Sequence, residues 1–231
     1  GFITSHAVEN IELLETDAVR KFIGEYNPEH YLLKKENPLA VGPYDVSAYY
    51  MEHKVQEAEA MKAAKSRILE VAAEFEKISG RRYGLFEEYR MEDAQLALVL
   101  IGSTAGTAKA AIDKLREDGV KAGLVKIRVF RPFPGEELAR ALADTRAVAV
   151  MDKSEGFSAS GGPLFAETRS ALYDLKERPY MINIVYGLGG RDVKTEDIEK
   201  VFGRLADIAV TGEAHPAYTH MGQRSREEET V

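Results

Sequence analysis

Short runs of consecutive apolar residues fill the second half of the chain and alternate with segments of helical spacing. Residues 96–101 are the clearest run, and a run without polar alternation is typical of a strand that is covered on both faces. The other runs predict strands at 85–89, 124–130, 147–151 and 181–186. The segments between them predict helices at 105–118, 135–143 and 163–176. This alternation predicts an α/β fold, a three-layer α/β/α arrangement in which helices cover both faces of a mostly parallel sheet.

A long amphipathic helix is predicted over residues 47–79, where Ser47 is in position to cap it. Its apolar stripe consists of Met51, Val55, Ala58, Met61, Ala64, Ile68, Val71, Phe75 and Ile78. The other faces are charged, and the pattern leaves two interpretations open. A helix that packs along its own domain is favoured over a helix with a coiled-coil partner.

The two ends of the chain carry weaker patterns. Residues 8–14 predict a short strand, a brief helix begins at Thr16, and the glycines and prolines of residues 24–45 predict an irregular linker. A last helix begins at Thr195, and from Thr211 the chain is polar and aperiodic, which predicts a tail that is disordered or laid on a partner. These patterns divide the chain into the end of an upstream domain with a linker (1–45), the long helix (46–80), the α/β domain (81–210) and the tail (211–231).

Composition narrows the functional classes. The 231 residues are 45% hydrophobic and carry a formal net charge of −7, which argues against nucleic acid as the main partner. No cysteine is present, so the chain offers no disulfide and no thiolate for an iron–sulfur cluster. The five histidines lack the spacing of a metal-ligand set, so no metal site is expected. No apolar run approaches the ~20 residues of a membrane span and no leader is visible, so we expect a cytoplasmic protein without a membrane partner.

Three loops follow predicted strands, at the edge of a parallel sheet where ligands bind. Gly102, Ser103 and Thr104 precede a helix, so their N–H groups are candidates for holding an anion, although small residues also permit a tight turn. Residues 152–162 form either a loop that closes on a ligand or partner, or a solvated connection. Arg191 follows three glycines and is a candidate for pairing with a carboxylate across a subunit boundary, or with a nearby carboxylate of its own chain. No catalytic residue is identified, because no phosphate-binding, dinucleotide-binding or nucleophile motif is complete.

A known protein family has similar sequence segments in the same order along the chain. Residues 101–108 (Ile-Gly-Ser-Thr-Ala-Gly-Thr-Ala) and 126–134 (Lys-Ile-Arg-Val-Phe-Arg-Pro-Phe-Pro) resemble the C-terminal domain of transketolase-type, thiamine-dependent enzymes. More closely, the chain resembles the alpha subunit of 2-oxoacid:ferredoxin oxidoreductases of the pyruvate synthase type. Residues 1–6, 161–165 and 186–192 carry this closer resemblance. A transketolase C-terminal-like fold is therefore expected for the α/β domain.

The resemblance also implies a function. It implies part of an alpha subunit that acts in the reversible oxidative decarboxylation of pyruvate, or a related 2-oxoacid, with coenzyme A and ferredoxin. Thiamine diphosphate, Mg²⁺ and 4Fe–4S clusters are expected in the complex and none on this chain alone, with other subunits as partners. A subunit specific for oxalate, 2-oxoglutarate or a branched-chain 2-oxoacid is an alternative, and a non-catalytic α/β interaction module is another.

Thr4, Ser5 and His6 form a polar triplet near the start of the chain. In the family that the chain resembles, this is where the first domain passes into the second. We predict that the triplet is buried at that boundary by hydrogen bonds or faces the cofactor cleft. The chain begins with Gly1 rather than methionine, and the resemblance places a cofactor-holding domain upstream. This segment is therefore expected to be structural and subunit-interface rather than directly catalytic.

Overall fold

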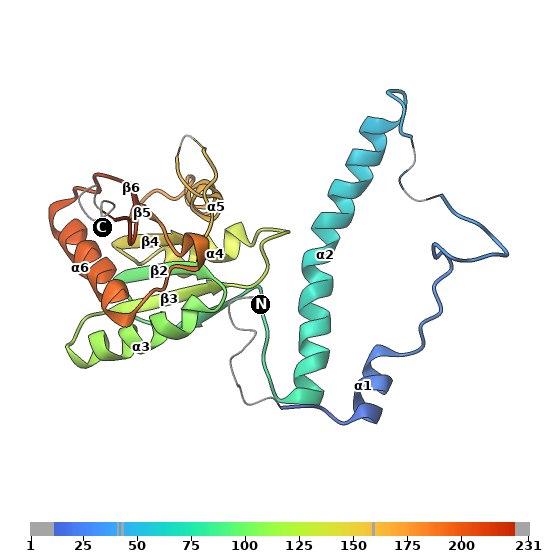
Figure 1. Ribbon diagram of the computed structural model, residues 1–231, viewed down its shortest axis with the longest axis horizontal. Coiled ribbons are helices and arrows are strands. Elements are labelled where there is room, and N and C mark those ends of the chain that lie inside the picture. The colour runs from blue at the N-terminus through green and yellow to red at the C-terminus, as the bar shows by residue number, and fades with distance from the viewer. Residues whose placement is uncertain (1–11, 41, 43, 159, 225–231) are drawn as a thin grey trace. The chain divides into compact units, whose positions relative to one another are not determined.

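The computed structural model describes residues 12–40, 42, 44–158 and 160–224. The chain divides into two compact units, Gly1–Tyr83 and Gly84–Val231. Figure 1 shows the helices and strands of both units, and the whole sheet belongs to the second.

A six-stranded sheet forms the centre of the second unit. Its strands are β1 (Phe86–Tyr89), β2 (Leu96–Ile101), β3 (Ala122–Ile127), β4 (Ala147–Asp152), β5 (Tyr180–Val185) and β6 (Tyr218–His220). They lie in the order β1-β3-β2-β4-β5-β6, in which β1 is antiparallel to β3 and every other neighbouring pair is parallel. The mostly parallel sheet that the apolar runs predict is therefore confirmed.

Helices cover both faces of this sheet (Figure 1). They are α3 (Thr104–Glu117), α4 (Gly135–Leu142), α5 (Pro163–Ala171) and α6 (Thr195–Thr211). Strand β2 divides its side chains between two cores: Leu96, Leu98 and Leu100 pack in the core with α3 and α6. Ala97 and Val99 pack in the other core, with α4 and α5. Because both faces of β2 are buried, its sequence is apolar without alternation, and the three-layer arrangement is confirmed.

Two strands differ from the prediction. β3 ends at Ile127 because the amides of Arg128 and Val129 both donate to the carbonyl of Leu85, at 3.0 and 2.9 Å, which ends the regular pairing with β1. β6 lies inside the segment predicted as a tail, so that expectation is wrong for residues 218–220. β6 is held beside β5 partly by the amide of Asn183, which donates to the carbonyl of Ala217 at 2.7 Å. A strand of three residues is too short to leave a hydrophobic period in the sequence.

The first unit contains α1 (Thr16–Ile23) and α2 (Tyr50–Ser79). α2 has 30 residues and no buried residue, and Gly80, which follows it, caps it in the left-handed conformation. The ring of Phe75 lies 5.8 Å from the ring of Phe22 in α1, beside a groove on α2 that is lined mainly by apolar side chains. The strand predicted at 8–14 is not found at residues 12–14, and residues 8–11 lie outside the described residues.

Candidate functional site

The carboxyl ends of the parallel strands lie along one edge of the sheet. β2 ends just before Gly102, β4 ends at Asp152, β5 ends at Val185 and β6 ends at His220. The three loops predicted as candidates all begin at this edge. The edge is therefore the place where side chains from distant parts of the second unit meet.

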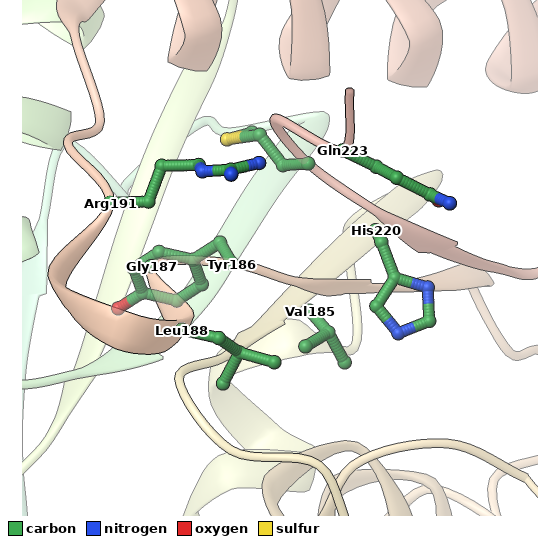
Figure 2. Close-up of a pocket in the computed structure, with 8 residues that line it drawn as sticks. Val185, Tyr186, Gly187, Leu188, Arg191, His220 and Gln223 are labelled. Carbon is green, nitrogen blue, oxygen red and sulfur yellow. The ribbon is translucent and has the colours of Figure 1, made fainter. Parts of the chain in front are cut away.

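A pocket of about 340 Å³ lies at this edge, between the turn after β5 and the segment after β6. Its lining consists of Val185, Tyr186, Gly187, Leu188, Arg191, His220, Met221 and Gln223. Figure 2 shows Arg191 and His220 on opposite sides of the pocket, with Val185 and Leu188 between them. The amide of Met221 donates to the carbonyl of Val185 at 2.8 Å, which fixes the segment after β6 against the end of β5. The third candidate loop thus forms a wall of this pocket.

Arg191 does not pair with Asp192, and its pairing with a carboxylate across a subunit boundary stays a prediction. Its Nη1 donates to the backbone carbonyl of Gly222, and among the described residues it forms no ion pair with a carboxylate, Asp192 included. Gly222 has a φ of +76°, and a Cβ atom there would lie 3.1 Å from Cδ of Arg191. Glycine at this position therefore lets the arginine lie flat against the chain.

The predicted loop after β2 forms a tight turn. The amides of Ala105 and Gly106 donate to the carbonyls of Gly102 and Ser103, at 3.4 and 2.9 Å, so two early N–H groups of α3 are already used. This favours the turn interpretation, and anion binding at Gly102 and Ser103 stays a prediction. Thr104 accepts a hydrogen bond at 3.2 Å from the hydroxyl of Tyr186, a pocket residue. Burial raises the pKa of Tyr186, and the charge of Asp152 adds to the effect.

A cluster that sequence reasoning missed joins the second candidate loop to β6. The carboxylate of Glu155 accepts hydrogen bonds from the hydroxyl of Tyr218 and from Nε2 of His220, the latter at 2.8 Å. These bonds, that of Tyr218 foremost, lower the pKa of Glu155 to about 2. The bond to Glu155 and burial raise the pKa of Tyr218 to about 12. No local pattern could reveal the cluster, since more than sixty positions separate Glu155 from both Tyr218 and His220.

Buried polar groups fix the other end of the same loop. Asp152 accepts from the amides of Leu164 and Phe165, at 2.8 and 3.1 Å, and from Nδ2 of Asn183 at 2.9 Å. Asn183 Oδ1 in turn accepts from the amide of Gly162 at 2.9 Å. Burial raises the pKa of Asp152, although these hydrogen bonds oppose that shift. The carboxylate caps the first turn of α5, so this end of the loop is a fixed connection.

The remaining candidates lie outside the described residues. Thr4, Ser5 and His6 fall within residues 1–11, which are outside the described part of the chain. Within the described residues, no group of three histidine, cysteine, aspartate or glutamate side chains could hold a metal ion. No described helix is both long and apolar enough to cross a membrane.

Comparison with known proteins adds two family models that match in sequence order. Residues 1–73 match the thiamine diphosphate-binding domain of pyruvate flavodoxin/ferredoxin oxidoreductases. Residues 94–198 match core domain II of pyruvate:ferredoxin oxidoreductase. The second match falls in the unit that contains the sheet and the pocket.

Two curated relatives agree with these matches. Pyruvate synthase subunit PorA of Thermotoga maritima is 47% identical over 87% of this chain and 51% of its own length. Ketoisovalerate oxidoreductase subunit VorA of Pyrococcus horikoshii is 36% identical over 92% of this chain and 54% of its own length. A solved split-gene transketolase, an inactive tetramer, is 16% identical with a TM-score of 0.44, over 56% of this chain and 44% of that chain. The chain spans about half the length of the curated relatives that it matches.

Proposed function

Because the chain belongs to the family of 2-oxoacid:ferredoxin oxidoreductase alpha subunits, we propose that it is part of the alpha subunit of a pyruvate synthase. The observation that carries the proposal is the pair of family matches, over residues 1–73 and 94–198, together with the 47% identity to a PorA subunit. The complete complex, on this proposal, decarboxylates pyruvate oxidatively, transfers the acyl group to coenzyme A and reduces ferredoxin. The reverse reaction uses the same components, and the complex is cytoplasmic.

The match of residues 1–73 to a thiamine diphosphate-binding domain supports that cofactor in the complex. When bound, thiamine diphosphate supplies the electron sink for decarboxylation. Among the described residues, no group of three acidic, histidine or cysteine side chains could hold a metal ion. The sequence has no cysteine for an iron–sulfur cluster. We therefore assign the 4Fe–4S clusters to partner subunits, and we propose that Mg²⁺ is present in the complex and is not held by this chain alone.

This segment has a structural and interface role in the proposal. α2 has no buried residue in its own unit, and its apolar stripe suits a surface that other parts of the complex cover. The triplet Thr4, Ser5 and His6 is proposed to lie at the boundary between domains. His6→Ala should then weaken assembly or turnover of the complex, because a lost buried hydrogen bond costs on the order of 1–3 kcal/mol.

The relative named VorA favours one rival substrate, a branched-chain 2-oxoacid. Oxalate and 2-oxoglutarate are further alternatives within the family, and a non-catalytic interaction module is the alternative outside it. Purification of the intact complex, followed by measurement of 2-oxoacid-dependent reduction of ferredoxin or a viologen dye, separates these possibilities. The proposal expects pyruvate to give the highest kcat/KM among the four acids. A preference for another acid would reassign the substrate, and the absence of any 2-oxoacid-dependent reduction would overturn the enzymatic proposal.

A further inference from the structure

We propose that the pocket lined by Arg191 and His220 binds the oxyanion group of a small molecule, a phosphate or a carboxylate, with the guanidinium of Arg191 as the principal ligand. The pocket has a volume of about 340 Å³ and lies at the carboxyl edge of the parallel strands, where α/β folds place their ligands. The inference goes beyond the proposed function, because all the residues involved belong to the second unit and binding needs no partner subunit.

The charge of Arg191 is not neutralised by the residues around it. A guanidinium has five N–H donors, and the structure shows one of them donating to the neutral carbonyl of Gly222. No described carboxylate forms an ion pair with Arg191. A fork of N–H donors with donors to spare matches the two oxygens of a phosphate or carboxylate. Arg191 therefore has donors available to bind an oxyanion.

The same arginine is held in place before any ligand arrives. Its Cδ would lie 3.1 Å from a Cβ on residue 222, and the φ of +76° at that position favours glycine, so the arginine packs closely against the backbone there. Residue 222 is itself positioned, because Met221 is hydrogen-bonded to the end of β5. A side chain that is already ordered loses less conformational entropy when it binds.

The turn after β5 also lies against a second positively charged residue, Lys153 of the loop after β4. Gly187 and Leu188 of this turn line the pocket, and the backbone of Gly187 and Gly189 has positive φ, at +65° in both. A Cβ on Gly187 would lie 3.0 Å from Cε of Lys153, so the stem of that lysine packs against the turn. Among the described residues Lys153 has no ion-pair partner either. Both cations therefore favour an anion at this turn.

Two carboxylates oppose the anion. Asp192 follows Arg191 in sequence, and Glu155 lies next to His220 on the far wall. Glu155 already accepts hydrogen bonds from Tyr218 and His220, which stabilise its charge within the protein. Weak, salt-sensitive binding is the expected result, since the site is open to solvent and ionic strength screens exposed charges.

The test is a titration of the whole chain with anions, in which amide chemical shifts in NMR spectra report binding. Inorganic phosphate and pyrophosphate form one arm, acetate and pyruvate form the other, and sodium chloride at equal ionic strength is the reference. We expect saturable shifts at Gly187, Leu188 and Gly189 with at least one arm, and the arm that saturates at lower concentration identifies the class of oxyanion. Shifts that follow ionic strength alone, or that occur elsewhere on the surface, would overturn the proposal.

Variants assign the binding to Arg191. Arg191→Ala should weaken it about tenfold or more, the scale of a lost charge-assisted hydrogen bond. Arg191→Lys keeps the charge without the fork and should bind with intermediate affinity, which also serves if the alanine variant folds poorly. Arg178→Ala is the matched control, because Arg178 also donates to a backbone carbonyl, that of Tyr173, at 3.0 Å. Equal affinity in the native chain and in Arg191→Ala would refute the assignment.

Discussion

The two units of this chain differ in how far their apolar residues are buried. In the second unit β4 is buried along its whole length, and β2 is buried except at its last residue. In the first unit the 30 residues of α2 include none that is buried, although an apolar stripe follows the helix. The continuous apolar runs of β2 and β4 therefore indicate strands that helices of the same unit bury on both faces. A helical period shows only which face is to be covered, since most helical stability in proteins comes from tertiary packing.

Hydrogen exchange on the whole chain tests this contrast most strongly. Amides of β2 and β4 should open only with global unfolding, whereas amides of α2 open locally. We expect protection factors in the two strands to exceed those in α2 by about three orders of magnitude or more. Mass spectrometry of exchanged peptides measures the difference. Equal protection in α2 and β4 would mean that the helix is already covered in the free chain.

Replacing one leucine in each unit by alanine should give the next largest effect, a difference in the loss of stability. Leu98 in β2 is fully buried, whereas Leu69 in α2 is 41% exposed. Leu98→Ala should lower the free energy of unfolding by about 2–5 kcal/mol, because it leaves a cavity between the sheet and its helices. Leu69→Ala should change it by less than about 1 kcal/mol. Urea unfolding of both variants checks this, and a larger effect at Leu69 would reverse the contrast between the units.

Matched glycines sharpen the comparison inside the second unit. A Cβ on Gly162 would lie 2.3 Å from Cγ of Asp152, whose position is fixed by the start of α5, whereas a Cβ on Gly106 in α3 meets nothing within 4 Å. Gly162→Ala should therefore destabilise the chain by about 1–3 kcal/mol. Gly106→Ala should stabilise it by about 0.5–1 kcal/mol through helix propensity. Thermal unfolding midpoints should move in opposite directions, and a shift of the same sign in both would contradict this assignment.

The smallest effect is a dependence of stability on pH. The pKa of Glu155 is about 2 in the folded chain, below its ordinary 4.5, so its contribution is present above pH 4.5 and is lost as the pH falls towards 2. The pKa of Tyr218 is about 12 rather than 10, so its contribution is present below pH 10 and is lost as the pH rises towards 12. Glu155→Gln should reduce stability at pH 7 and converge with the native chain at low pH.

Denaturant midpoints across pH 2–7 measure this convergence. Glu70→Gln is the control in the first unit, since Glu70 pairs with Arg67 at 2.6 Å on an exposed face of α2. Exposed pairs of this kind contribute little to stability. A difference between Glu155→Gln and the native chain that stays constant from pH 7 to pH 2 would show that the hydrogen bonds of Glu155 do not depend on its charge.

The sequence predicts the parts of this structure that have a local cause. The apolar run at 96–101 predicts β2, and the period around Ile198 predicts α6, because each is a repeat within one element. Arg191 is recognised as a candidate, yet its partner is a carbonyl that belongs to a segment thirty-one positions later. The cluster of Glu155 with Tyr218 depends on β6, whose three residues carry no period.

The place of β6 in the chain has a consequence for biosynthesis. Every other strand of the sheet leaves the ribosome before residues 218–220, so the sheet can assemble while its last edge position is still empty. The pocket wall at Met221 and Gln223, and the partners of Glu155, arrive only then. A nascent chain that stops before β6 therefore has a nearly complete core but neither the pocket nor the Glu155 cluster. The pocket can therefore form only after residues 218–223 have been synthesised.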